Sequence, residues 1–109
     1  MKRFAQTVFL RDEPDIIRRY EEYHANPWPE VVQGLHNCGV LRMFIYRIGR
    51  QLFMFMEATD GFDLERDMPT YMAHPRARQW DELMQSLQDR LPEAPPGSTW
   101  MLMREIFVL

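Results

Sequence analysis

The fold of this chain is decided by residues 40–58, which read VLRMFIYRIGRQLFMFMEA. Two runs rich in aromatic, aliphatic and methionine side chains, 40–48 and 51–58, flank the turn signal Gly49-Arg50. Short apolar runs that are joined by a tight turn are typical of a β-hairpin. We therefore predict two antiparallel strands at the centre of the chain.

Helices and strands are predicted on both sides of this hairpin. Acidic residues before Pro14, and then apolar residues at helical spacing from Ile16 to His24, indicate an amphipathic helix. A second stripe of apolar residues runs from Trp80 to Leu91. The predicted flanking elements are a strand over 3–10, a helix from Pro14, a helix over 29–38, a weak helix over 64–72, a helix over 76–91 and a strand over 100–109.

This order of elements, β-α(α)-β-β-(α)α-β, predicts an α+β fold of the split βαβ, ferredoxin-like kind. Such a fold has a four-stranded antiparallel sheet with its helices on one face. Because the predicted strands are rich in Met, Phe and Tyr, we expect the other face to be covered by a second copy of the chain. The expected assembly is a homodimer.

Composition limits the classes of function. The 109 residues predict one domain, 1–109, and 46% hydrophobic residues argue against disorder. The formal net charge of −3 argues against nucleic acid as a partner. Aromatic residues make up 13% of the chain, which predicts either a dense core or a pocket with apolar walls.

Cys38 is the only cysteine, so we expect neither an intramolecular disulfide nor a multi-cysteine zinc site. The three histidines do not follow a metal-ligand spacing, and we predict no metal and no cofactor. No apolar run approaches the ~18 residues of a membrane span, and the start of the chain lacks a signal peptide. We expect a cytoplasmic protein that does not engage a membrane.

His24 is the first candidate for chemistry. It follows Tyr20 by four residues, so both side chains share a helix face. A partly buried imidazole near a helix C-terminus, where its protonated form is favoured, suits general acid–base catalysis. The alternative is a capping or core-edge histidine whose hydrogen bonds are satisfied.

Four further side chains are candidates for substrate contact. Trp28 lies between two prolines and forms either a pocket wall or the anchor of an interhelical turn. Trp80 either lines a pocket or fills the core. Glu57 and Glu105 lie in apolar strands, where a carboxylate is costly unless it is paired or used. If these two glutamates face water, they are ordinary surface residues.

Several segments resemble the L-rhamnose mutarotase family of small sugar epimerases. The resemblance covers nearly the whole chain, and its most specific part is Tyr20, three residues, His24 and then Trp28-Pro29-Glu30. The other matching segments are Ile45-Tyr46, Leu52–Glu57 and Glu105–Leu109.

The resemblance implies a dimeric, ferredoxin-like α/β barrel that interconverts the α and β anomers of a 6-deoxy-hexose without a cofactor. The family's proton donor falls on His24 and its first sugar-binding tyrosine on Tyr20. One of its two adjacent sugar-binding tryptophans falls on Trp80. We expect Tyr46 and Trp28 to offer further stacking surface, with Glu57 or Glu105 as a partner of His24.

This sequence departs from the family in three places. Met43 stands where the family has a further tyrosine, and only Trp80 within Arg78–Asp81 matches the family's pair of tryptophans. The stretch from that helix to the final strand, which includes 95–100, is also slightly longer than in the rhamnose enzymes. The departures resemble a branch that is associated with L-fucose. Alternatives from other classes are a cofactor-free monooxygenase, lactone isomerase or haem binder of the same fold, and a non-catalytic ligand-binding module.

Overall fold

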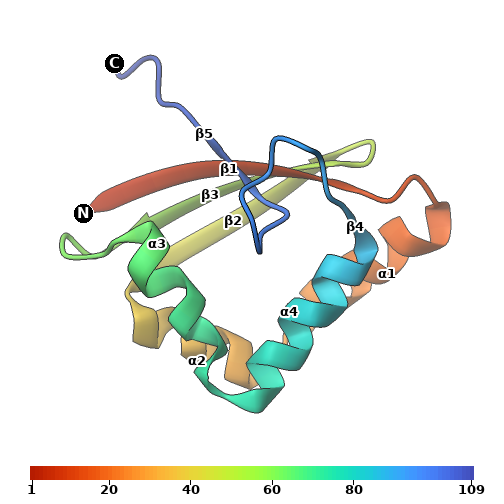
Figure 1. Ribbon diagram of the computed structural model, residues 1–109, viewed down its shortest axis with the longest axis horizontal. Helices are drawn as coiled ribbons and strands as arrows, with labels where there is room; N and C mark the ends of the chain where they lie inside the picture. The colour runs from red at the N-terminus through yellow and green to blue at the C-terminus, as the bar shows by residue number, and fades with distance from the viewer.

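The computed structural model describes all residues, 1–109. In chain order its elements are β1 (Lys2–Leu10), α1 (Pro14–Ala25), α2 (Pro29–Cys38), β2 (Val40–Ile48), β3 (Gln51–Ala58), α3 (Leu64–Asp67), the 3₁₀ helix η1 (Met68–Ala73), α4 (Pro75–Leu87), β4 (Gln88–Asp89) and β5 (Met101–Met103) (Figure 1). The predicted hairpin is confirmed, and so is the predicted second helix.

One antiparallel sheet organises the chain. Its strands lie in the order β2-β3-β1-β4, and β5 pairs with a different part of β1. In the first half of the chain, α1 and α2 connect β1 to β2, and β3 lies between these two strands. In the second half, α3, η1 and α4 connect β3 to β4, and β1 lies between them. The helices all lie against one face of the sheet (Figure 1). The predicted α+β, split βαβ arrangement is confirmed.

Alternation along the strands separates the two faces of the sheet. On β3, Leu52, Met54 and Met56 are at most 5% exposed because they pack under the helices. Phe53, between Leu52 and Met54, is 37% exposed and points to the other face. The methionines at alternate positions of β3 are therefore core residues.

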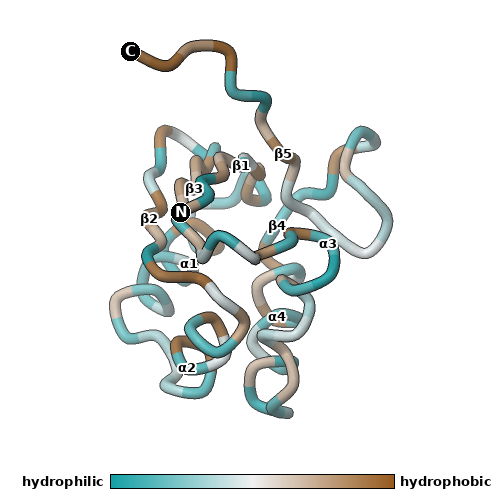
Figure 2. Tube along the Cα trace, turned by 90° about the vertical axis from the view of Figure 1, so that its left-hand side faces the viewer, coloured by the Kyte–Doolittle hydropathy of each residue, from teal (hydrophilic) through white to brown (hydrophobic).

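The face away from the helices is apolar and open. Pairing of β2 with β3 places Tyr46 opposite Phe53 and Phe44 opposite Phe55 on this face. Tyr46 is 61% exposed, and Ile48 beyond it is 80% exposed. The last four residues, 106–109, are also apolar and exposed, and they extend away from the body of the molecule (Figure 2). None of the helices combines the length and apolar character that a membrane span needs.

The predicted strand over 100–109 was wrong in its extent, because regular pairing ends at Met103. Ala5–Met103 is the last pair of the β1–β5 ladder. An ion pair between Arg3 and Glu105 continues the contact through side chains. A segment with strand-forming side chains becomes a strand only where its backbone groups find partners, and residues 104–109 have none in the sheet.

The predicted helix over 76–91 was also too long. It ends at Leu87, and Gln88 and Asp89 turn back to pair with Leu10 and Phe9 of β1. The backbone of Gln88 is extended rather than helical. The apolar residue at Leu91 continued the helical pattern in the sequence, but pairing with β1 determines the local structure.

Gly34 lowers the helix propensity of α2, but its lack of a side chain allows α2 to pack closely against η1. A Cβ at this position of α2 would lie 2.3 Å from the carbonyl oxygen of Tyr71 in η1. Gly34→Ala gains about 1 kcal/mol of helix propensity but forces α2 and η1 apart. We expect a net loss of about 1–3 kcal/mol in the free energy of unfolding, measured by chemical denaturation.

The matched control is Gly61→Ala, because a Cβ on Gly61 would meet nothing within 4 Å. A Gly34→Ala protein as stable as the wild type would show that α2 and η1 are not held at this distance.

Candidate active site

Helix α1 brings Tyr20 and His24 together. The helix begins with Pro14 in its first turn, and His24 lies in its last turn. The Tyr20 and His24 rings stack with centroids 4.3 Å apart and planes 22° apart. His24 Nδ1 lies 2.8 Å from the carbonyl oxygen of Tyr20. Because a carbonyl only accepts hydrogen bonds, Nδ1 carries the proton, and Nε2 presents a free lone pair.

Burial lowers the pKa of His24 below its ordinary value of 6.5, while the hydrogen bond to the Tyr20 carbonyl opposes this shift. The expectation that the end of α1 favours the protonated imidazole was wrong. Desolvation is the larger cause at this position, since the ring packs against Tyr20 and Trp80. The resting state of His24 at neutral pH is a neutral base.

Aromatic rings support His24 on the side of α4. The Trp80 ring meets the His24 ring edge-on at 5.2 Å, and Trp28 meets Trp80 edge-on at 5.3 Å. Arg76 lies over the Trp28 ring at 3.9 Å from its centroid. Trp80 is 5% exposed, so it is a core residue and a contact of His24 at once. Trp28 is only partly buried, between its two prolines.

A cleft of about 480 Å³ opens beside His24, between α1 and the β2–β3 hairpin. Its apolar lining includes Ile45 and Leu52, and its rim carries an ion pair between Glu21 and Arg47. The full lining comprises Tyr20, Glu21, His24, Ala25, Ile45, Tyr46, Arg47 and Leu52. A base, a phenol, apolar walls and a charged rim therefore meet in one cavity.

The remaining candidates from the sequence lie elsewhere. Tyr46 borders the cleft, but its ring stacks with Phe53 on the open face of the sheet, with centroids 6.2 Å apart. Glu57 lies opposite Arg3 on that same face and forms an ion pair with Arg42. Glu57 and Glu105 do not line the cleft. The structure thus groups Tyr20, His24, Trp28 and Trp80 and separates them from both glutamates.

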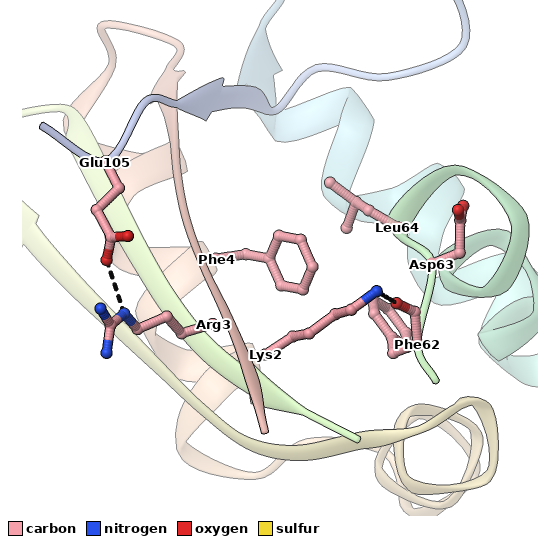
Figure 3. A pocket seen from close by; sticks show the side chains of 7 residues that line it. All are labelled: Lys2, Arg3, Phe4, Phe62, Asp63, Leu64 and Glu105. Carbon is pink, nitrogen blue, oxygen red and sulfur yellow. Dashed lines mark hydrogen bonds and ion pairs between the residues drawn. The ribbon is translucent and has the colours of Figure 1, made fainter. Parts of the chain in front are cut away.

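A second cleft has a similar volume, but each of its charged side chains has a partner within the chain. It lies between the start of β1, the start of α3 and the C-terminal tail (Figure 3). Lys2 Nζ donates to the carbonyl oxygen of Phe62 at 2.7 Å, and Arg3 pairs with Glu105. Asp63 caps α3 through the Arg66 N–H. Since each charged group is engaged within the chain, the His24 cleft is the better candidate for an active site.

Comparison with known proteins assigns the family. A model of the L-rhamnose mutarotase family matches residues 3–109. The chain is also 32% identical to the L-fucose mutarotase of Xanthomonas campestris pv. campestris, over 100% of this chain and 89% of that protein. The chain belongs to the L-rhamnose mutarotase family. It is accordingly a sugar mutarotase, an isomerase that interconverts sugar anomers.

Solved structures agree on the fold. The crystal structure of the L-rhamnose mutarotase FA22100 from Formosa agariphila matches with a TM-score of 0.71 and 22% identity, over 100% of this chain and 99% of that one. The tetracenomycin F2 cyclase of Streptomyces glaucescens matches with a TM-score of 0.60 and 13% identity, over 100% and 99% of the two chains. This fold is shared by proteins of different names, so the mutarotase assignment rests on the sequence match.

Met43, and Asp81 next to Trp80, both contact other residues of the chain. Met43 packs against the core cluster that contains Phe62. Asp81 accepts a hydrogen bond from the Tyr71 hydroxyl at 2.6 Å. Burial and the neighbouring Asp81 carboxylate raise the pKa of Tyr71 well above its usual range. Both side chains are therefore engaged by other residues of the chain.

Sequence reasoning missed several polar residues near the site. Gln88 donates to the Tyr20 hydroxyl oxygen at 3.2 Å, and Thr99 donates to Gln88. One oxygen of Glu30, Oε2, is buried without a hydrogen-bond partner. The Trp28-Pro29-Glu30 motif was a signal for Glu30, whereas nothing in the local sequence marks Gln88 or Thr99.

The lowered pKa of His24 has a consequence for stability. The unfolded chain takes up a proton near pH 6.5, whereas the folded chain takes it up only at lower pH. The contribution of neutral His24 to folding is therefore complete above pH 6.5 and is lost as the pH falls towards the folded-state pKa. We expect NMR titration of the His24 ring to give a pKa below 6.5.

The same linkage is testable by urea unfolding at about pH 7.5 and about pH 5.5. His24→Phe serves as the control, and it is expected to lose less stability over this interval than the wild type. A His24 pKa at or above the ordinary value would contradict the burial of its ring.

Proposed function

We propose that this mutarotase acts on a 6-deoxy-hexose, L-fucose or L-rhamnose, with His24 as its general acid and base. One observation carries the proposal: His24 Nε2 is a free, neutral acceptor at the edge of a cleft large enough for a monosaccharide. The names of the family and of the Xanthomonas relative support the choice of sugar.

The reaction requires two proton transfers. His24 Nε2 removes the proton of the anomeric hydroxyl, while an acid protonates the ring oxygen as the bond between C1 and that oxygen breaks. The open-chain aldehyde then turns about the C1–C2 bond. Attack of the sugar's own hydroxyl on the opposite face of the carbonyl closes the ring. The attacking hydroxyl returns its proton to the acid, and His24 returns its proton to the new anomeric oxygen. No redox step or external group is needed.

The cleft supplies the other contacts. The Tyr20 hydroxyl is the protein donor in our proposal, aimed at the ring oxygen or a neighbouring hydroxyl. Ile45 and Leu52 form an apolar wall that suits the C6 methyl group of a 6-deoxy sugar. Trp28 and Trp80 do not line the cleft: Trp80 packs edge-on against the imidazole, and Trp28 packs against Trp80 behind it. Glu57 and Glu105 have no part in this mechanism.

One measurement distinguishes a mutarotase from the two alternative functions considered for this fold. A cofactor-free monooxygenase or isomerase binds its own substrates and leaves sugar anomers unaffected, whereas a binding module binds a sugar without accelerating exchange. Saturation-transfer NMR of freshly dissolved L-fucose and L-rhamnose separates these cases from a mutarotase. Faster anomer exchange with protein present supports the proposal, and unchanged exchange for both sugars sinks it.

His24→Ala removes the proposed base and leaves a larger cleft. We expect the rate of anomer exchange to fall by about 10²-fold or more, which is the usual contribution of a positioned acid or base. Saturation-transfer NMR at equal protein concentration is the measurement. The control is His36→Ala, because His36 is an exposed histidine on α2 outside the cleft. A wild-type rate for His24→Ala would remove His24 from the mechanism.

We further propose that residues 1–109 form a single domain that works as a homodimer in the cytoplasm. The family model spans residues 3–109, which supports one domain. Cys38 is a free thiol, as expected in a reducing compartment. Phe44, Tyr46 and Ile48 project from β2 onto the open face of the sheet, and burial of such a face by a second copy supports the dimer.

The dimer predicts a mass of twice 13.2 kDa in sedimentation or light scattering. Phe53→Glu places a charge in the middle of the open face, where burial against a partner would leave it unpaired, so we expect a monomer. Val32→Glu is the control, since it makes the same change at an exposed apolar position on α2. A monomeric wild type at micromolar concentration would overturn this part of the proposal.

A further inference from the structure

A chain of buried hydrogen bonds leads from the proline-rich loop to the cleft. The Thr99 hydroxyl donates to Gln88 Oε1, and Gln88 Nε2 donates to the Tyr20 hydroxyl oxygen at 3.2 Å. Thr99 is 5% exposed, Gln88 7% and Tyr20 4%. Burying a polar side chain costs free energy, so a line of three buried polar side chains points to a role for them.

The orientation of the Gln88 amide determines which partner donates in the hydrogen bond between Gln88 and Tyr20. Since Thr99 engages the carbonyl end of the Gln88 side chain, the amide end points at Tyr20 and occupies an acceptor site on its oxygen. No side chain or carbonyl of the protein accepts the Tyr20 hydroxyl proton. Burial raises the pKa of Tyr20 to about 12, with the Gln88 bond acting against this rise, so that proton stays in place at neutral pH.

Tyr71 shows what the other arrangement looks like in the same molecule. Its hydroxyl donates to the Asp81 carboxylate at 2.6 Å, so the hydroxyl proton already has an acceptor within the protein. A carboxylate partner accepts the hydrogen bond of the phenol hydroxyl. The Gln88 amide instead donates to the hydroxyl oxygen and leaves the hydroxyl proton without an acceptor in the protein. Tyr20 is also one of the residues that line the cleft beside His24.

The fold holds Gln88 and Thr99 rigidly. Gln88 pairs through its backbone with Leu10 of β1. The loop that carries Thr99 is held by Arg90, whose guanidinium donates to the carbonyl oxygens of Ala94 and Pro95 at 2.8 and 3.1 Å. Ala94 is 5% exposed, which anchors this loop in the core.

We infer that Gln88, oriented by Thr99, is a positioning residue for mutarotation, which makes Tyr20 donate its hydroxyl proton to a sugar oxygen beside His24. This inference rests on the proposed function, and it adds two residues that act through Tyr20 without touching the substrate. The proline-rich loop thereby contributes to catalysis from outside the cleft.

The decisive variant is Gln88→Glu, which keeps the shape of the side chain but replaces the donor by an acceptor. The Tyr20 hydroxyl then donates into the protein, as Tyr71 does, and we expect kcat for anomer exchange to fall roughly tenfold or more. Gln33→Glu is the control, since it makes the same charge change on the exposed surface of α2. Thermal unfolding verifies that each variant is folded.

A double-mutant cycle separates positioning from general structural support. In a Tyr20→Phe background no hydroxyl remains to be aimed, so Gln88→Glu should then cost little further activity. Thr99→Val, which frees the amide to rotate, should lower kcat in part, and Thr99→Ser should restore it. If Gln88→Glu costs as much in the Tyr20→Phe background as in the wild type, Gln88 does not act through Tyr20 and the inference fails.

A readout without sugar keeps this test independent of the proposed function. Gln88→Leu removes the bond that lowers the Tyr20 pKa, so NMR titration of ¹³Cζ-labelled tyrosine should show that pKa rising further. An unchanged Tyr20 pKa would show that the Gln88 bond is absent. A raised pKa in a protein that fails to accelerate anomer exchange would overturn the proposed function while the hydrogen bond stands.

Discussion

The hydrogen bond of 2.8 Å between His24 Nδ1 and the Tyr20 carbonyl is the contact on which the chemistry of the site depends. It ties a side chain to the backbone one helical turn earlier, so the geometry of α1 alone sets the position of the ring. The bond assigns the tautomer, and the stacked Tyr20 ring and the edge of Trp80 then fix the plane of the imidazole. A base whose orientation is set in this way does not have to be ordered when the substrate arrives.

The two faces of the sheet divide the aromatic and methionine residues into separate roles. Residues of β3 that face the helices, such as Met54 and Met56, complete the core behind the site. Residues that face away, such as Phe53, form an apolar surface that the chain itself leaves open. The excess of such residues in the composition therefore reflects a core and an uncovered face more than a pocket. The cleft takes only a few of them.

Local patterns foretold the parts of the structure that depend on near neighbours. The four-residue spacing of Tyr20 and His24 placed both on one helix face, and the Gly49-Arg50 signal located the hairpin turn. Contacts distant in sequence could not be found this way. Gln88 and Tyr20 are 68 positions apart, and their bond exists only because β4 returns to β1. Alternation alone could not orient Glu57, because a shift of one residue would exchange the faces of its strand.

The C-terminal strand failed as a prediction for a related reason. Residues 104–109 have the side chains of a strand, yet a strand needs a partner with free backbone groups along its length. The β1–β5 ladder ends at the Ala5–Met103 pair, and beyond it the two segments are linked only by the Arg3–Glu105 ion pair. Sequence patterns indicate which segments are able to pair, whereas contacts in the folded chain decide how far pairing extends.

The selectivity of the site depends on which polar groups line the cleft. Met43 stands where the family resemblance implies a tyrosine, and it packs against the core, while Asp81 beside Trp80 is bonded to Tyr71. Apart from His24, the polar groups lining the cleft are then few: the Tyr20 and Tyr46 positions and the Glu21–Arg47 pair at the rim. Epimeric sugars differ only in the direction of hydroxyl groups, and a site separates them strongly only where a buried polar group would be left unpaired by the wrong epimer. Since the rim pair is open to water, it applies little of that penalty. In the proposed mechanism, discrimination among 6-deoxy-hexoses therefore falls chiefly on the Tyr20 hydroxyl, which is the group that we propose Gln88 and Thr99 orient.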